Sequence, residues 1–188
     1  ATHGFYVALQ QERNEVGESQ RGLSFSSGLS RLRGDSNPLL RSGIVLAGAN
    51  RLADMTDDQA TSLEDGWVTA QEIVGMDFRH TQLVVLSACE SGLGDLSNGQ
   101  GVQGLRRSFI NAGAHAVLTS LFEVPDDETR QLMRGFYQTL PTTPDLRHAL
   151  CQSQRELIAS RRQQSQAAHP FFWASFILLG AAQEFSEN

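Results

Sequence analysis

His3 and Cys89 are the two residues whose side chains could act together as a nucleophile and its acid–base partner. A thiol becomes an effective nucleophile when a neighbouring imidazole favours its thiolate or shuttles its proton. His3 is followed by Gly4 and looks like the end of a strand, and Cys89 comes just after the apolar run 83–87. Groups beyond the carboxyl ends of parallel strands face one crevice, so we expect the two side chains to meet there. The backbone amides of Gly4 and Cys89 could then stabilise an oxyanion.

Both residues also have a purely structural interpretation. Free cysteine is among the most buried residue types, so Cys89 could be a small core residue, and an isolated histidine is often structural. The second cysteine, Cys151, lies in a predicted helix and is expected to be a buried, inert thiol. The other four histidines are scattered, and we expect none of them to be catalytic: His80, His115, His148 and His169.

Two acidic residues, Asp126 and Asp127, follow the predicted strand 115–121. We expect this strand to lie next to the strand that precedes Cys89. The helix that begins at Asp126 would then start at the edge of the same crevice. The alternative is that the two carboxylates only stabilise the helix, because negative charges in a first helical turn interact favourably with the helix dipole. In that case they bind no substrate.

The elements that must position these residues alternate between apolar runs typical of strands and segments with helical periodicity. Thr69 and Glu72 form a capping-box pattern that opens a short helix to about Gly75. Further helices are predicted over 102–112, 126–140 and 144–162, and strands over 44–49, 83–87, 115–121 and 171–179. The pattern predicts an α/β fold with a mainly parallel sheet flanked by helices, whose first strand or strands are missing from this chain.

Composition narrows the class of partner. The 188 residues carry a net charge of −6, and all 15 basic residues are arginine. An acidic chain without a clustered basic face argues against nucleic acid as a partner, and a Walker A phosphate loop would need a lysine. No apolar run is long enough to cross a bilayer and no signal-peptide pattern opens the chain, so we expect a cytoplasmic protein without a membrane partner.

The two cysteines predict neither a disulfide framework nor a zinc site, and we expect no metal and no cofactor. The segment 9–42 is rich in Gln, Arg, Ser and Gly and predicts a long ordered loop. Loops of this length are often functional, so it could cover the crevice or be a processing site. A plain solvated loop is the alternative.

Several separate motifs resemble those of the CHAT domain, a caspase-like domain often found downstream of tetratricopeptide repeats in bacteria. They occur in the family's order and cover nearly the whole chain: Ala1-Thr-His-Gly, Leu83-Val-Val-Leu-Ser-Ala-Cys-Glu-Ser-Gly-Leu-Gly, Gly101-Val-Gln-Gly-Leu, Ala112-Gly-Ala, Ser120-Leu-Phe-Glu-Val-Pro-Asp-Asp and His169-Pro-Phe-Phe-Trp. True caspases are a more distant match, because Ser87 stands where their signature has glutamine.

The resemblance implies a thiol protease of the clan that includes caspases, gingipains and separase. In such a hydrolase, His3 and Cys89 would form the catalytic dyad, and the amides of Gly4 and Cys89 the oxyanion hole. Asp126 matches an aspartate of the separase motif that binds arginine before the scissile bond, so Asp126 and Asp127 are expected to bind substrate.

The resemblance also implies a caspase-like layered fold and a single CHAT domain over residues 1–188, cut from a longer protein with an upstream tetratricopeptide-repeat region or a regulatory partner. The leading interpretation is a cysteine endopeptidase acting on protein or peptide substrates. The alternative is a non-catalytic interaction or scaffold domain that keeps the fold for binding.

Overall fold

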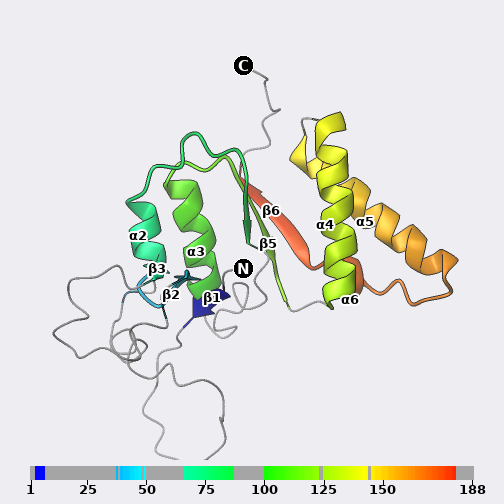
Figure 1. The fold of residues 1–188 in the computed structure, drawn as a ribbon, viewed down its shortest axis with the longest axis horizontal. Coiled ribbons are helices and arrows are strands. Elements are labelled where there is room, and N and C mark those ends of the chain that lie inside the picture. Colours follow the sequence, from blue (N-terminus) through cyan, green and yellow to red (C-terminus); the bar gives the residue numbers. More distant parts are fainter. Residues whose placement is uncertain are drawn as a thin grey trace, which may run out of the picture.

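The computed structural model contains two small β-sheets and six helical segments among the residues that it describes (Figure 1). Those residues are 3–6, 37, 39–47, 49, 66–86, 100–122, 125–143 and 145–180. Strands and helices are mixed along the chain, which confirms the predicted α/β class. None of the helices in these ranges is long and apolar enough to span a bilayer.

The first sheet is antiparallel and holds β1 (His3–Tyr6), β2 (Ser42–Val45) and β3 (Trp67–Thr69), in that order. β3 runs directly into α2 (Ala70–Val74), and Thr69 is the N-cap of this helix. The Thr69 hydroxyl accepts a hydrogen bond from the Glu72 backbone N–H at 3.2 Å, and the Thr69 backbone N–H donates to the Glu72 carboxylate at 2.7 Å. The predicted capping box is therefore confirmed.

The second sheet has the order β4 (Val84–Leu86), β5 (Ala116–Ser120) and β6 (Phe176–Gly180). β4 and β5 are parallel, whereas β5 and β6 are antiparallel. Every residue of β5 is buried, because this strand lies between two partners and under helices on both faces.

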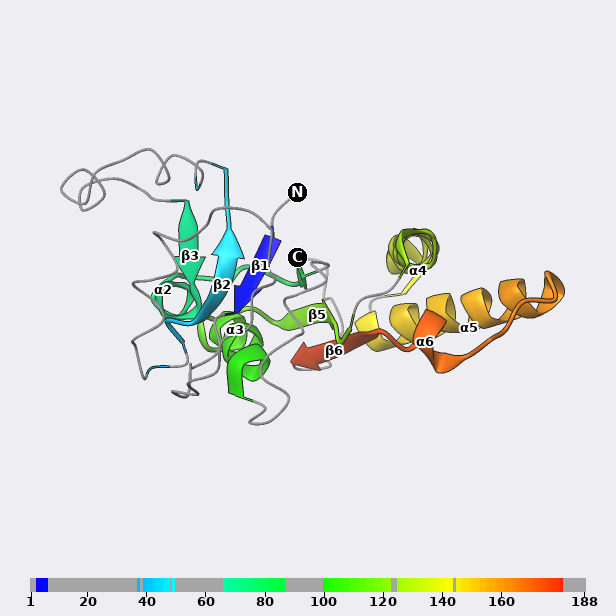
Figure 2. The same cartoon turned by 90° about the horizontal axis from the view of Figure 1, so that it is seen from below.

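Helices cover both faces of the second sheet (Figures 1 and 2). On one face, α4 (Asp126–Thr139) and α5 (Leu146–Gln163) form a core with Ala116 and Leu118. On the other face, α2 and α3 (Gln100–Asn111) form a core with Val117. The alternation of Ala116, Val117 and Leu118 between the two cores follows from the two-residue repeat of a strand.

The sequence-based element bounds hold well for the longer helices. α3, α4 and α5 begin and end within two residues of the predicted limits. α3 ends just before Gly113, which has a positive φ of 106° that other residues rarely adopt. α4 continues into the short 3-10 helix η2 (Leu140–Thr142).

Two expectations about the sheet need revision. Only the β4–β5 pair is parallel among the strand pairs that the structure describes, so a mainly parallel central sheet and caspase-like layering are not confirmed. The predicted strand 171–179 is wrong in its first part, where the chain forms the short helix α6 (Pro170–Trp173) before β6 begins at Phe176. His169 caps this helix, because its Nδ1 accepts the Phe171 backbone N–H at 3.2 Å.

Candidate functional site

The carboxyl ends of β4 and β5 lie side by side in the second sheet. Leu86, the last residue of β4, is in register with Thr119 of β5. This confirms the prediction that the strand before Asp126 neighbours the strand before Cys89. Cys89 itself follows Leu86 by three residues and lies outside the described residues.

His3 is the first residue of β1, not the last residue of a strand as expected. It pairs with Val45, and Gly4 pairs with Ile44. The antiparallel pairing with the apolar Ile44 and Val45 draws residues 3–6 into the first sheet and explains why the strand continues beyond the histidine. The structure describes the backbone of His3 and Gly4 in this strand.

Helix α3 connects the sheet that carries His3 to the strand that precedes Cys89. Leu105 and Phe109 of α3 are buried in one core with Ile44 of β2 and Val84 of β4 packed against it. In two views at right angles, β1 lies beside one end of α3 (Figures 1 and 2). One hydrophobic core thus holds β4, which leads to Cys89, and β2, which pairs with the strand that carries His3.

Asp126 and Asp127 are exposed in the first turn of α4. The Asp127 carboxylate forms an ion pair with Arg130, one turn later in the same helix. The Asp126 carboxylate has no hydrogen-bond or ion-pair partner in the part of the chain that the structure describes. The N-cap residue is Pro125, which offers no side-chain acceptor, so the acidic residues are the groups that complement the positive end of the helix.

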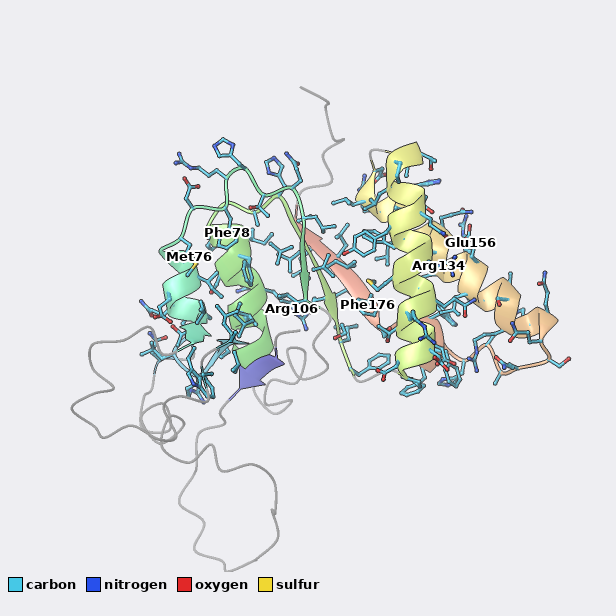
Figure 3. All side chains as sticks on the ribbon, in the orientation of Figure 1. Met76, Phe78, Arg106, Arg134, Glu156 and Phe176 are labelled. Atoms are coloured by element: carbon cyan, nitrogen blue, oxygen red, sulfur yellow. The ribbon has the colours of Figure 1, made fainter. Side chains whose placement is uncertain are left out.

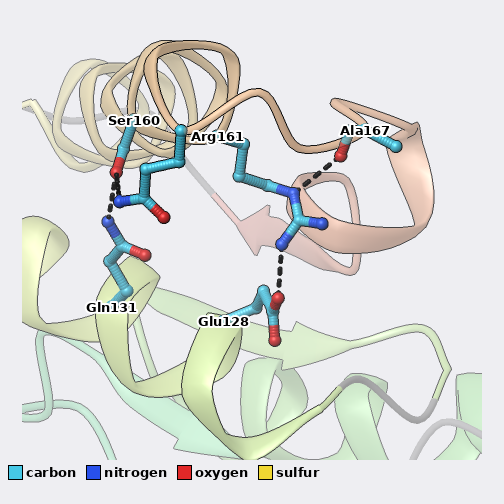
Figure 4. Close-up of polar contacts among 6 residues, drawn as sticks. Glu128, Gln131, Ser160, Arg161 and Ala167 are labelled. Carbon is cyan, nitrogen blue, oxygen red and sulfur yellow. Dashed lines mark hydrogen bonds and ion pairs between the residues drawn. The ribbon is translucent and has the colours of Figure 1, made fainter.

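The third acidic residue of this turn, Glu128, forms the contact that the sequence did not reveal. Its carboxylate pairs with the guanidinium of Arg161 at the end of α5, and both side chains are almost buried (Figure 4). Arg161 also donates through Nε to the Ala167 carbonyl at 2.7 Å and lies 3.6 Å from the centroid of the Phe172 ring. Helical periodicity places Arg161 on the buried face of α5, but only the tertiary structure identifies its partner, 33 residues away.

An aromatic cluster lies where β5 ends and α6 begins. The Phe122 and Phe171 rings are stacked, with centroids 5.7 Å apart and an interplanar angle of 13°. Trp173 packs against the core of the α4–α5 face and donates from Nε1 to the Ala168 carbonyl at 3.1 Å. Trp173 therefore has a packing role, whereas Phe171 keeps 42% of its surface exposed.

Other candidate residues lie elsewhere in the structure. Cys151 is exposed, so the expectation of a buried thiol is wrong. It lies beside the buried stripe of α5 that contains Ala149 and Leu150. A shallow polar cavity of about 400 Å³ between α4 and α5 is lined in part by His148 and Glu156, and none of the predicted site residues lines it.

Arg106 on α3 is an unusual buried cation (Figure 3). It is 6% exposed, and its Nε has no hydrogen-bond partner among the residues that the structure describes. Burial lowers the pKa of its guanidinium from the ordinary value. Nothing in the sequence pattern singled it out, because it stands beside another arginine in a helix where one face is apolar.

Comparison with known proteins identifies the family. The CHAT domain model matches residues 1–181. The chain is also 29% identical over 132 residues to human "Tetratricopeptide repeat protein 28", and 32% identical over 100 residues to the mouse protein of that name. These matches cover 68% and 53% of this chain but only 5% and 4% of the relatives, both of which are mammalian, so the expected bacterial origin gains no support. The chain therefore belongs to the CHAT domain family, which is related to the caspase-like cysteine peptidases.

Proposed function

We propose that this chain is a cysteine endopeptidase in which Cys89 is the nucleophile and His3 the general acid and base. The proposal is supported above all by the CHAT match, which spans both residues. It is also supported by chain connectivity, since three residues reach at most about 11 Å. Cys89 is therefore tethered close to the carboxyl end of β4, and β4 packs in the same hydrophobic core as β2, the strand that pairs with β1.

The reaction needs only these two side chains and backbone amides. The Cys89 thiolate attacks the carbonyl carbon of the scissile peptide bond, and the amides of Gly4 and Cys89 stabilise the oxyanion. Protonated His3 then gives its proton to the leaving amine, and a thioester remains on Cys89. His3 next takes a proton from water, hydroxide attacks the thioester, and the thiol is regenerated with release of the carboxylic acid.

We further propose that the substrate is a protein segment bound next to the start of α4, with arginine before the scissile bond. Asp126 supports this choice, because its carboxylate is exposed and not engaged within the described structure. Asp127 would raise the local negative potential, although Arg130 already neutralises part of its charge. The names of the mammalian relatives point to a tetratricopeptide-repeat region as the natural context, and a reactive thiol fits the reducing cytoplasm.

The test is cleavage of a quenched fluorescent peptide library by the purified chain, with Cys89→Ala and Cys151→Ser as paired variants. Cys89→Ala should abolish cleavage without changing the circular dichroism spectrum, because it removes one sulfur atom. Cys151→Ser should retain activity, because the exposed Cys151 thiol lies on α5 and is not a member of the proposed dyad. Full activity of Cys89→Ala would refute the proposal.

The second candidate is a non-catalytic interaction domain. It is favoured by the names of the relatives, which describe repeat proteins and mention no peptidase. This function predicts no cleavage of any library peptide by wild type, together with equal binding of protein partners by wild type and Cys89→Ala.

A further inference from the structure

Arg106 is a buried cation that pairs with no anion of the described residues. Its side chain takes part in none of the ion pairs found among them, and its Nε is buried without a hydrogen-bond partner there. An arginine side chain stays protonated in a protein, and an uncompensated buried charge is costly. A bound anion would therefore stabilise this part of the molecule.

The place of Arg106 on α3 turns its side chain away from the first sheet and toward the second. Gly104 faces the first sheet, because a Cβ added there would lie 3.6 Å from the Ser42 Oγ of β2. Arg106 is two residues later, which is about 200° around the helix. It is also within about 60° of Phe109, which is buried in one core with Val117 of β5. In Figure 3 the Arg106 side chain points from α3 toward β5.

The Arg106 side chain extends toward the carboxyl end of β5. β4 and β5 are parallel, so α3, which connects them, runs antiparallel to both, and its N-terminal end lies over their carboxyl ends. Arg106 lies about 7.5 Å along the helix from Asn111, the last residue of α3. Helical side chains point back toward the N-terminus of their helix, which carries the guanidinium further in the same direction.

Two buried hydroxyl side chains lie on the α3 face at this end of the sheet. Thr119 is two residues after Val117, and Ser175 comes one residue before Phe176, which packs in the core of the opposite face. The Ser175 carbonyl accepts the Leu121 backbone N–H at 2.7 Å, which places Ser175 against the end of β5. Polar groups thus replace the apolar core where the Arg106 side chain arrives.

The donors of this polar group are not used within the described structure. Ser175 is 1% exposed, and its Oγ has no hydrogen-bond partner among the described residues. Leu121 follows directly and is 37% exposed, so this end of β5 reaches the protein surface. A carboxylate suits such a place, because it accepts two N–H bonds from a guanidinium and a further bond from a hydroxyl.

We propose that Arg106 and Ser175 form an anion site that binds an acidic side chain of the substrate peptide. The inference rests on the proposed function, because the site lies at the end of β5 and the neighbouring strand β4 leads to Cys89. It adds a second determinant of specificity, for a residue other than the arginine before the scissile bond. The Arg106 guanidinium pairs with the carboxylate and the Ser175 hydroxyl donates to it.

Isothermal titration calorimetry with the Cys89→Ala protein measures binding separately from catalysis. The probes are acetylated hexapeptide amides with arginine in the fourth place and a glutamate in each other place in turn, beside the same peptides with glutamine. In one of these places glutamate should bind about tenfold more tightly than glutamine. The net charge of −6 repels acidic peptides in general, so this preference would identify a local cation.

Three variants in the same background test the two residues. Arg106→Gln should remove the preference for glutamate. Ser175→Ala should reduce it about two- to fivefold, since it removes one neutral donor. Arg107→Gln is the matched control and should keep the preference, because Arg107 is the exposed neighbour in α3. Equal loss in Arg106→Gln and Arg107→Gln would refute the site.

Thermal unfolding of the free protein distinguishes a substrate carboxylate from a carboxylate of the chain itself. If the substrate supplies the anion, Arg106 is unpaired without it, and Arg106→Met should leave the melting temperature unchanged or raise it. A large fall in the melting temperature would mean that the chain fills its own site, and it would overturn the inference.

The outcomes also separate this inference from the peptidase. A glutamate preference that depends on Arg106, without any cleavage by wild type, would support the anion site and refute the peptidase. Cleavage of library peptides without a glutamate preference in any place would refute the anion site and leave the peptidase standing.

Discussion

The Glu128 carboxylate and the Arg161 guanidinium form an ion pair that joins the first turn of α4 to the last turn of α5 (Figure 4). The side chains are 17% and 10% exposed, so either partner alone would leave an almost buried charge. The pair also fixes Arg161 against the Ala167 carbonyl and the Phe172 ring. Arg161 thus links α6 to the acidic start of α4.

Glu128→Gln is expected to lower the free energy of unfolding by about 3 kcal/mol, the usual cost of removing one partner of a buried pair. Urea denaturation monitored by circular dichroism measures the change. The matched control is Arg130→Gln, which breaks the exposed ion pair with Asp127 in the same helix and should have little effect. Equal effects of the two substitutions would contradict a stabilising role for the Glu128–Arg161 pair.

Gly180→Ala should be poorly tolerated. Gly180 has a φ of 114°, and an added Cβ would overlap the His115 carbonyl oxygen at the edge of the second sheet. We expect a loss of at least about 2 kcal/mol in unfolding free energy. Gly75→Ala is the control, since its φ is −80° and its Cβ would lie 3.3 Å from the Glu72 carbonyl oxygen. A similar melting temperature for both variants would argue against the close approach at Gly180.

Asp145, the N-cap of α5, should make stability depend on pH. Its side chain accepts the Arg147 backbone N–H at 2.9 Å, and this bond, aided by the Arg147 side chain, lowers the pKa of Asp145 below 3.8. The carboxylate therefore stabilises the fold above the unfolded pKa, and this contribution is lost as the pH falls through the folded pKa. Asparagine keeps the cap without the charge. The difference in unfolding free energy between wild type and Asp145→Asn should thus shrink as the pH falls from about 6 to about 2. A constant difference would mean that the charge of Asp145 does not stabilise the fold.

Short sequence patterns predicted the local structure well, but they could not predict contacts between residues that are far apart in the chain. The Thr69–Glu72 capping box and the end of α3 at Gly113 depend on neighbours in sequence. His169 followed by Pro170 also carried a helix-start signal, but the aromatic residues after them obscured it. The Glu128–Arg161 pair could not be predicted, because 33 residues separate its partners.

Some features of the candidate site could likewise be predicted from the sequence, whereas others depend on the tertiary structure. The position of Asp126 beyond a strand next to β4 followed from the order of elements, and the β4–β5 pairing confirms that neighbourhood. The exposure of Cys151 could have been inferred, since it lies outside the apolar stripe of α5 formed by Leu146, Ala149 and Leu150. The meeting of His3 and Cys89 remains a prediction that depends on the tertiary structure around 87–99, outside the described residues.

His3→Ala should slow alkylation of Cys89 without preventing it. A neighbouring imidazole lowers the pKa of a thiol from its ordinary value of about 8.5, so its loss should reduce the rate at neutral pH by roughly three- to tenfold. Peptide mass spectrometry after iodoacetamide treatment follows Cys89 in a Cys151→Ser background, which removes the exposed second thiol. The pH at half-maximal rate should rise toward about 8.5. An unchanged rate and pH profile would mean that the two side chains do not meet.

Asp126→Ala should reduce cleavage after arginine and leave cleavage after methionine nearly unchanged. The reason is that a carboxylate distinguishes the guanidinium from a neutral side chain, and charge-assisted hydrogen bonds are about twice as strong as neutral ones. Comparison of kcat/KM for the two peptides gives the specificity ratio, which should fall about tenfold or more for a loss of about 1.4 kcal/mol.

Asp127→Ala is the matched control for this experiment, because Asp127 is also exposed but already paired with Arg130. It should lower the arginine preference much less than Asp126→Ala. If Asp126→Ala retains the preference for arginine, Asp126 does not bind the arginine, and the specificity must then arise from another part of the chain. If both substitutions reduce it equally, the effect is a general electrostatic attraction and not a contact with one carboxylate.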